Sequence, residues 1–328
     1  LNVFGFVVLT VPSFELVKRT DVAIDDGGTG PVAAFTADVL SVQMTAGGFV
    51  GVGGALSAAN DSTATVVTTD AVGFSVPSGS LLDLVILQDT TTAANKYTGL
   101  QARVTNAGLV GIDDLELIVT GDVQVNKGPA AGRLDWSVAT TSGDPDNKLP
   151  DLAMDHNVEL AIHNGEAALN VFGFVVLSVS EFELVKRTGV SIDDGAAGPV
   201  AAFTADVLSV SLTASGFVGV GGKLSVPDDS SSAVETADAV GFNVPSGSLD
   251  LVIVQDTTTK ANKYTGLQTS VTNAGLVGID DLELIVTGDV QVNKGSAAGR
   301  LDWSAVTGVS NELPDADLAM GHDVELEV

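Results

Sequence analysis

The chain has 328 residues, of which 42 are acidic and 14 basic, so its formal net charge is −28. So acidic a surface repels the phosphates of nucleic acids and anionic membranes, and we expect neither nucleic-acid binding nor membrane insertion. The absence of cysteine excludes a disulfide framework, thiol catalysis and cysteine-ligated zinc.

The dominant feature of the sequence is an internal duplication. Residues 1–6 (LNVFGF) recur at residues 169–174, and residues 104–128 recur without change at residues 271–295. Self-similarity at a fixed spacing marks a chain in which one structural module is used more than once.

The duplication predicts two β repeat units, residues 1–162 and residues 169–328, joined by a short linker at residues 163–168. The linker has no Pro or Ser run, so we expect it to restrict the freedom of the two units rather than act as a long tether. Such an arrangement extends to arrays of many copies. Because the sequence starts at Leu1 and not at Met, we expect a piece of a longer protein.

Taken in chain order, the elements read as strands. Residues 3–9 and 84–87 are apolar on both faces, which is typical of strands covered on both sides. The first of these follows directly on the linker in the second copy, so we expect the adjoining copy to cover it in part. Glycines flank residues 49–52 and indicate bulges or corners. Residues 119–126 and 158–162 alternate between apolar and polar side chains.

These patterns predict an all-β fold with almost no helix. Regular glycine corners fit a β-solenoid or prism, and they also fit a sandwich. We therefore expect two tandem copies of one such unit, stacked end to end.

The sequence contains no catalytic constellation. The histidines His156, His163 and His322 lie at strand starts or in the linker, and surface positions are expected for them. Adjacent aspartates on a strand point to opposite faces and cannot form the carboxylate pair of a glycosidase by themselves. Trp136 and Trp303 each follow Leu-Asp, and we expect core anchors rather than sugar-stacking platforms. The chain is therefore predicted not to be an enzyme.

Calcium is the one cofactor that the sequence raises as a hypothesis, and none is required. Ca²⁺ prefers several carboxylate and carbonyl oxygens, and acidic loops recur in both copies. Tight turns explain the same loops without a metal and are favoured, since Asp and Gly supply the backbone geometry of turns. The candidate ligands are Asp25, Asp26, Asp193, Asp194, Asp228 and Asp229.

Several motifs resemble a tandem module of very large exported bacterial proteins, similar to giant RTX-like adhesins. They are FELVKR (residues 14–19), GFVGVGG (48–54), GLVGIDDLELIVTGDVQVN (108–126) and RLDWS (133–137). The resemblance implies a spacing, surface-display or adhesive role and a secreted or cell-surface location. It supplies no catalytic residues. The nonapeptide calcium repeats of RTX proteins are absent from this sequence.

We therefore predict a structural or adhesive extracellular repeat that forms an elongated rod or filament on a bacterial surface. Its expected partners are neighbouring copies of the same repeat, with surface glycans or another cell as further candidates. One alternative is a carbohydrate- or cell-surface-binding module with its site in the variable loops at residues 57–69 or 137–150. The other is a β-helical polysaccharide-degrading enzyme, which the 14 basic residues disfavour.

Overall fold

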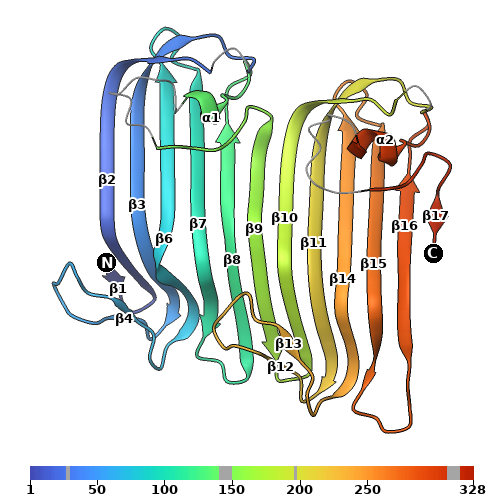
Figure 1. Ribbon diagram of the computed structural model, residues 1–328. Coiled ribbons are helices and arrows are strands. Elements are labelled where there is room, and N and C mark those ends of the chain that lie inside the picture. The colour runs from blue at the N-terminus through green and yellow to red at the C-terminus, as the bar shows by residue number, and fades with distance from the viewer. Residues whose placement is uncertain (27–29, 140–149, 196–197, 309–317) are drawn as a thin grey trace. The chain divides into compact units, whose positions relative to one another are not determined.

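The computed structural model describes residues 1–26, 30–139, 150–195, 198–308 and 318–328 (Figure 1). Strands make up 62% of the chain and helices 3%. The expected all-β fold with almost no helix is therefore confirmed. No helix in these ranges is long and apolar enough to cross a membrane.

The elements occur in the following order along the chain. The first are Asn2–Val3 (β1), Val7–Ile24 (β2), Phe35–Val52 (β3), Ala55–Leu56 (β4), Val66–Val67 (β5), Val72–Asp89 (β6), Lys96–Val110 (β7), Leu115–Lys127 (β8), Trp136–Ala139 (α1) and Val158–Val171 (β9). They are followed by Val175–Ile192 (β10), Phe203–Val220 (β11), Lys223–Leu224 (β12), Val234–Glu235 (β13), Val240–Asp256 (β14), Lys263–Val277 (β15), Ile285–Lys294 (β16), Trp303–Gly308 (α2) and Leu326–Glu327 (β17).

The main sheet is open and contains 13 antiparallel strands in the order β1-β2-β3-β6-β7-β8-β9-β10-β11-β14-β15-β16-β17. Two small hairpins, β4–β5 and β12–β13, lie outside it. Neighbouring strands are mostly consecutive in sequence, because each long strand folds back on the one before it. The expected solenoid, prism or sandwich is not confirmed.

One of the glycines that flank residues 49–52, Gly54, makes room for a buried aromatic ring, since a Cβ atom there would lie 2.3 Å from the ring of Phe49. Gly51 on β3 and Gly73 on β6 are register partners, and a Cβ atom on Gly51 would lie 2.7 Å from the ring of Phe49. The second copy repeats this arrangement at Gly219 and Gly241. The glycine pattern therefore reflects close packing of ring against backbone within a sheet.

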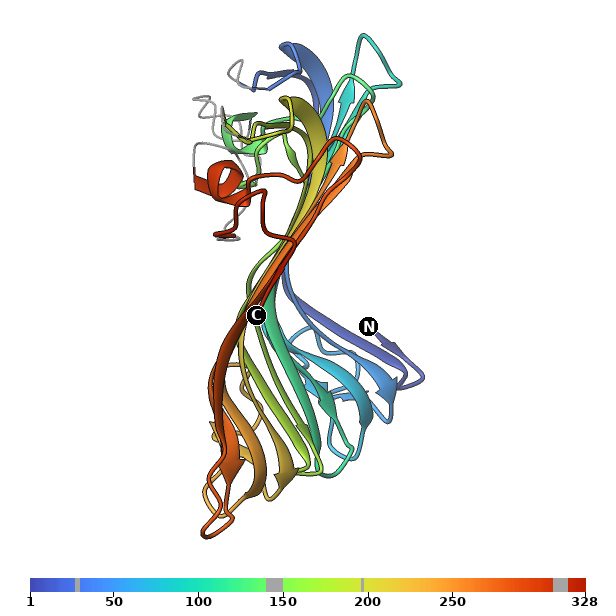
Figure 2. The ribbon, with the colours of Figure 1, turned by 90° about the vertical axis from the view of Figure 1, so that its right-hand side faces the viewer.

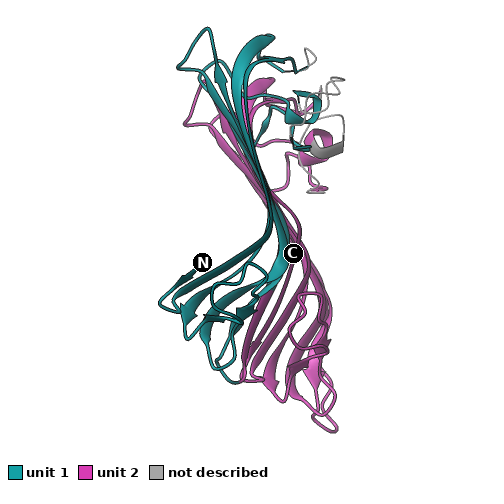
Figure 3. Ribbon diagram, turned by 90° about the vertical axis from the view of Figure 1, so that its left-hand side faces the viewer, with its two compact units in different colours: residues 1–113, 119–161 teal, residues 114–118, 162–328 magenta. Residues whose placement is uncertain are grey.

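The chain divides into two compact units, residues 1–113 with 119–161 and residues 114–118 with 162–328 (Figure 3). This division differs from the sequence boundaries, because residues 114–118 of the first copy belong to the second unit. Residues 163–168, predicted to be a linker, lie inside β9. They have no proline, so nothing in their backbone chemistry prevents them from continuing the strand.

Each unit has a large core at one end of its strands, beside its short helix. Figure 2 shows the strands twisting along their length, with α2 lying to one side of them. Trp136 in α1 and Trp303 in α2 are fully buried, which confirms their expected role as core anchors. Each belongs to a cluster with strand residues, such as Leu87 and Tyr97 in the first unit.

A buried asparagine attaches the segment that carries α1 to the sheet. Asn126 at the end of β8 is 0% exposed and accepts a hydrogen bond from the Trp136 indole N–H at 2.9 Å. Its Nδ2 donates to the carbonyl oxygens of Leu134 at 2.9 Å and Asp155 at 3.0 Å. Asn293 plays the same part for Trp303 in the second unit.

Replacing Asn126 by alanine should destabilise the first unit, because one indole N–H and two carbonyl groups lose their partner inside the core. We expect the free energy of unfolding to fall by about 2–4 kcal/mol. The neighbouring exposed Lys127→Ala is the control, expected within about 0.5 kcal/mol of the parent. Urea unfolding followed by tryptophan fluorescence measures both, and equal effects would contradict the proposed role of the network.

Candidate functional site

The strand β9 crosses the boundary between the two sequence copies. Its first five residues, 158–162, are the tail of the first copy, and its last three, 169–171, are the head of the second. Residues 163–168 lie between them in the same continuous strand of 14 residues. We call residues 162–171, the part of β9 in the second unit, the link strand.

A residue of the first copy completes a core in the second unit. Ile118 is only 3% exposed and belongs to a buried cluster with Ala168 of the link strand. The other buried members come from the second copy and are Val176, Phe217, Leu224 and Ala239. The backbone supports this placement, because the Phe172 N–H donates to the carbonyl oxygen of Asp114 at 2.7 Å.

The link strand makes specific side-chain contacts with the second copy. His163 Nδ1 lies 3.4 Å from Glu183 Oε1, and Ser230 Oγ donates to Glu166 Oε2 at 3.1 Å. Ser230 is 1% exposed, so this hydrogen bond satisfies a buried hydroxyl. The segment predicted to be a linker is thus an ordered part of the second unit.

A glycine fixes how the link strand meets β10. A Cβ atom on Gly165 would lie 2.6 Å from the carbonyl oxygen of Phe182 and 2.9 Å from its ring. Only glycine leaves room there, and the Phe182 ring covers the space that a side chain would occupy.

The residues around Ile118 recur in the second copy, where their surroundings differ. Ile285 is the counterpart of Ile118 within an identical stretch of sequence, yet it is 59% exposed. Leu282 and Leu284 beside it are also exposed, and β16 begins only at Ile285, whereas β8 begins at Leu115. Identical residues form a strand where the next copy covers them and lose part of it where they are uncovered.

The first copy has an equivalent but smaller cluster, whose described members include no counterpart of Ile118 or Ala168. Val8, Phe49 and Ala71 form a small buried cluster equivalent to the one that Ile118 completes. On the outer edge of β2, Phe14 is 58% and Leu16 is 54% exposed. Their counterparts in the second copy are half-buried. The described residues therefore contain one filled junction between copies.

The predicted calcium ligands lie in connecting segments outside the strands and helices. Asp25 is exposed whereas its neighbour Asp26 is buried, so the two side chains occupy different surroundings. Asp193 Oδ1 accepts the Gly195 N–H at 2.9 Å. An Asp side chain that accepts from the backbone two residues further on is a common local bond in loops.

The other acidic pairs have similar roles. Asp194 is buried, and its Oδ2 accepts the Val200 N–H at 3.3 Å. Asp228 has a positive φ of 57°, and Asp229 Oδ1 accepts both the N–H and the hydroxyl of Ser231. Within the described ranges, no three His, Asp or Glu side chains are grouped so as to hold a metal ion. Calcium binding remains a prediction.

The variable loops offer little to a ligand where they are described. In the loop at residues 57–69, Asp61 Oδ1 accepts the N–H and the hydroxyl of Thr63, each at 2.8 Å, and these bonds lower the pKa of the Asp61 carboxyl. Residues 140–149 of the second candidate loop lie outside the described residues.

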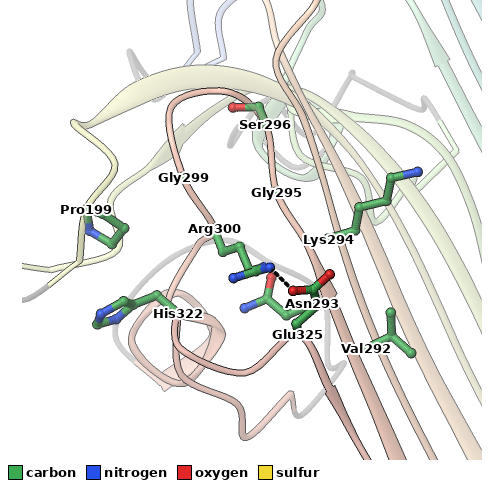
Figure 4. Close-up of a pocket in the computed structure, with 10 residues that line it drawn as sticks. All are labelled: Pro199, Val292, Asn293, Lys294, Gly295, Ser296, Gly299, Arg300, His322 and Glu325. Carbon is green, nitrogen blue, oxygen red and sulfur yellow. Dashed lines mark hydrogen bonds and ion pairs between the residues drawn. The ribbon is translucent and has the colours of Figure 1, made fainter.

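The second unit also has a cavity of about 680 Å³ next to β16 (Figure 4). Among its lining residues Glu325 is the single carboxylate, and it pairs with Arg300. Asn293 holds backbone carbonyls with its amide. A glycosidase needs two carboxylates across the scissile bond, and the described lining holds one.

Comparison with models of protein families, with curated proteins and with solved structures gives no match. The resemblance to adhesin repeats therefore rests on the motifs alone. The feature with the most specific geometry is the junction between copies.

Ile118 is buried and its counterpart Ile285 is exposed, so the two residues allow a matched test of the junction. Ile118→Ala should lower the free energy of unfolding by about 2–5 kcal/mol, since it opens a cavity in a packed core. Ile285→Ala should change it by less than about 0.5 kcal/mol, because its side chain already faces solvent. Urea unfolding followed by circular dichroism at low protein concentration compares the two. Equal losses would show that Ile118 is not a junction residue.

Proposed function

We propose that this chain is a structural repeat whose copies lengthen an open β-sheet by sharing strands, and that it serves as an elongated extracellular scaffold on a bacterial surface. The observation that carries the proposal is the burial of Ile118, from the first copy, in a core built by the second. Each copy thereby supplies what the next copy needs to complete its fold.

Sharing of this kind couples the stability of neighbouring copies. In repeat proteins the total stability is approximately a sum of intrinsic terms and nearest-neighbour terms. Here the neighbour term contains apolar burial at Ile118 and Ala168 and the polar contacts of His163 and Glu166. The proposed rod or filament follows from repeating this junction, with the copies stacked in tandem.

The acidic composition supports a role in which long sheets must stay soluble. Strand edges pair readily with other strands, and like charges on their surfaces oppose such aggregation. A net charge of −28 supplies this repulsion. The lack of cysteine and the resemblance to exported adhesin repeats favour the cell-surface location, where neighbouring copies are the first partners and glycans or another cell the targets of adhesion.

Chains lengthened by one and two further copies, each preceded by residues 163–168, test the proposal. We expect the unfolding midpoint to rise with copy number before it levels off, because each added copy adds one junction. The largest dimension from small-angle scattering should grow by equal steps. A matched chain with a Gly-Ser linker of the same length should lose both effects.

A midpoint independent of copy number, together with scattering from independently tumbling bodies, would rule out the structural proposal. Antibody labelling of intact source cells tests the location separately, and labelling only after permeabilisation would contradict it.

A further inference from the structure

We infer that one face of the sheet is an apolar docking surface through which two molecules of this chain pack face to face. The inference goes beyond the proposed function, because it concerns contact between separate chains and not the junction between copies. In the second unit this surface includes every second residue of β11 from Leu208 to Val220, and we call it the apolar face.

The strand β11 separates the two faces of the sheet most clearly. Successive side chains of a strand point to opposite faces, so residues 208, 210, 212, 214, 216, 218 and 220 share one face. Each of them is Leu, Val, Ala or Gly, and none is buried. The β11 residues in the buried clusters of this unit, Ala205, Val207 and Phe217, have odd numbers and therefore lie on the other face.

The strand register extends the apolar face over β10, β14, β15 and β16, the neighbours of β11 in the sheet (Figure 1). Residues paired directly across antiparallel strands project to the same side. Pairing through Val210 gives one row of side chains, and pairing through Leu212 gives the next. None of their members is buried, and the two rows are Leu184–Val210–Leu251–Leu267–Val292 and Phe182–Leu212–Leu249–Thr269–Val290.

The row between these two lies on the other face and is polar throughout. Its members are Glu183–Ser211–Asp250–Gln268–Gln291. Ser211 Oγ donates to Asp250 Oδ1 at 2.6 Å, and Gln291 Nε2 donates to Gln268 Oε1 at 3.2 Å. An antiparallel sheet with one polar, solvated face normally packs its other face against a core. No residue of the two apolar rows belongs to a buried cluster of the described chain, so that core is missing.

The first unit has the same face on its own strands. Its apolar rows are Leu16–Val42–Leu84–Leu100 and Phe14–Met44–Leu82–Ala102, with the polar row Glu15–Gln43–Asp83–Gln101 on the other face. The openness of the apolar face is not that of a sheet edge, because β3, β6, β11 and β14 each lie between two other strands.

A second molecule of the chain is the occupant that fits. A cover for this face must be apolar and must recur with each copy, because the rows recur with each copy. The same face of another molecule meets both conditions and is uncovered as well. The two apolar rows contain no carboxylate, so the net charge of −28 does not oppose contact there. Two sheets that pack face to face interdigitate such side chains in a layer about 10 Å thick.

The size of the face agrees with a stable interface. Beyond the two rows of the second unit, Val218 and Val220 are 61% and 60% exposed, and their partners Phe242 and Val240 share their face. Contiguous apolar surface of this extent marks an interaction site on a soluble protein. Specific interfaces use about 20–30 residues a side, which the apolar rows and these flanking residues approach.

Sedimentation velocity of the full chain at rising concentration tests the inference. We expect a reversible monomer–dimer equilibrium that saturates at the dimer, because pairing covers the one apolar face of each molecule. The double variant Val42→Lys/Val210→Lys places an ammonium group in the central row of each unit and should weaken association at least about a hundredfold. The control Thr45→Lys/Thr213→Lys adds the same charges on the other face of the same strands and should leave association unchanged. Circular dichroism confirms that both variants are folded.

Thiol accessibility gives a second readout that does not depend on a disruptive substitution. Because the chain has no cysteine, Val210→Cys and Thr213→Cys each introduce a single thiol. Modification of Val210→Cys by a charged maleimide should slow as the protein concentration rises, since the paired faces exclude the reagent. Modification of Thr213→Cys should proceed at the same rate at all concentrations.

Three results would overturn the inference. They are a monomer at all concentrations up to about 100 µM, association that survives Val42→Lys/Val210→Lys, and maleimide modification of Val210→Cys that does not depend on concentration. A chain that stays monomeric but binds neutral phosphatidylcholine vesicles would assign the face to lipid and would equally overturn it. The comparison of Ile118→Ala with Ile285→Ala tests the junction within one chain, so the proposed function and this inference can fail separately.

Discussion

The burial of one isoleucine in the core of the next copy is the interaction on which the remaining structure depends. Ile118 lies in a strand of the first copy, yet its contacts are with Ala168 and with residues of the second copy. Residues 114–118 and the link strand accordingly belong to the same compact unit as the second copy. A flexible tether at residues 163–168 would leave the isoleucine without its pocket.

The two halves of the chain show how far environment decides local structure. Residues 104–128 and 271–295 are identical in sequence, so their intrinsic strand preferences are the same. Nevertheless Leu115 begins a strand, whereas its counterpart Leu282 is exposed and lies outside β16. Strand propensity depends largely on packing against neighbours, and here the neighbours differ, since β9 lies beside β8 whereas the short β17 lies beside β16.

This dependence explains what the sequence could and could not predict. Alternation of apolar and polar residues identified the strands around residues 119–126, and the Leu-Asp-Trp motif identified the buried Trp136, since both signals are local. The duplication marks residues 163–168 as the link between the copies, but it does not reveal that they lie inside β9, where Phe182 covers Gly165. The calcium hypothesis drew on Asp pairs, and spacing alone does not reveal the bonds that Asp193, Asp194 and Asp229 accept from nearby backbone N–H groups.

The tails of the two copies are not equivalent in chemistry. Glu327 stands where the first copy has Ala161, which is fully buried in β9. Burying a carboxylate at that position without a partner is costly, so a strand built from the second tail would pack against a following copy less readily than one built from the first. One substitution in a nearly identical tail can thus weaken the packing that Ala161 allows.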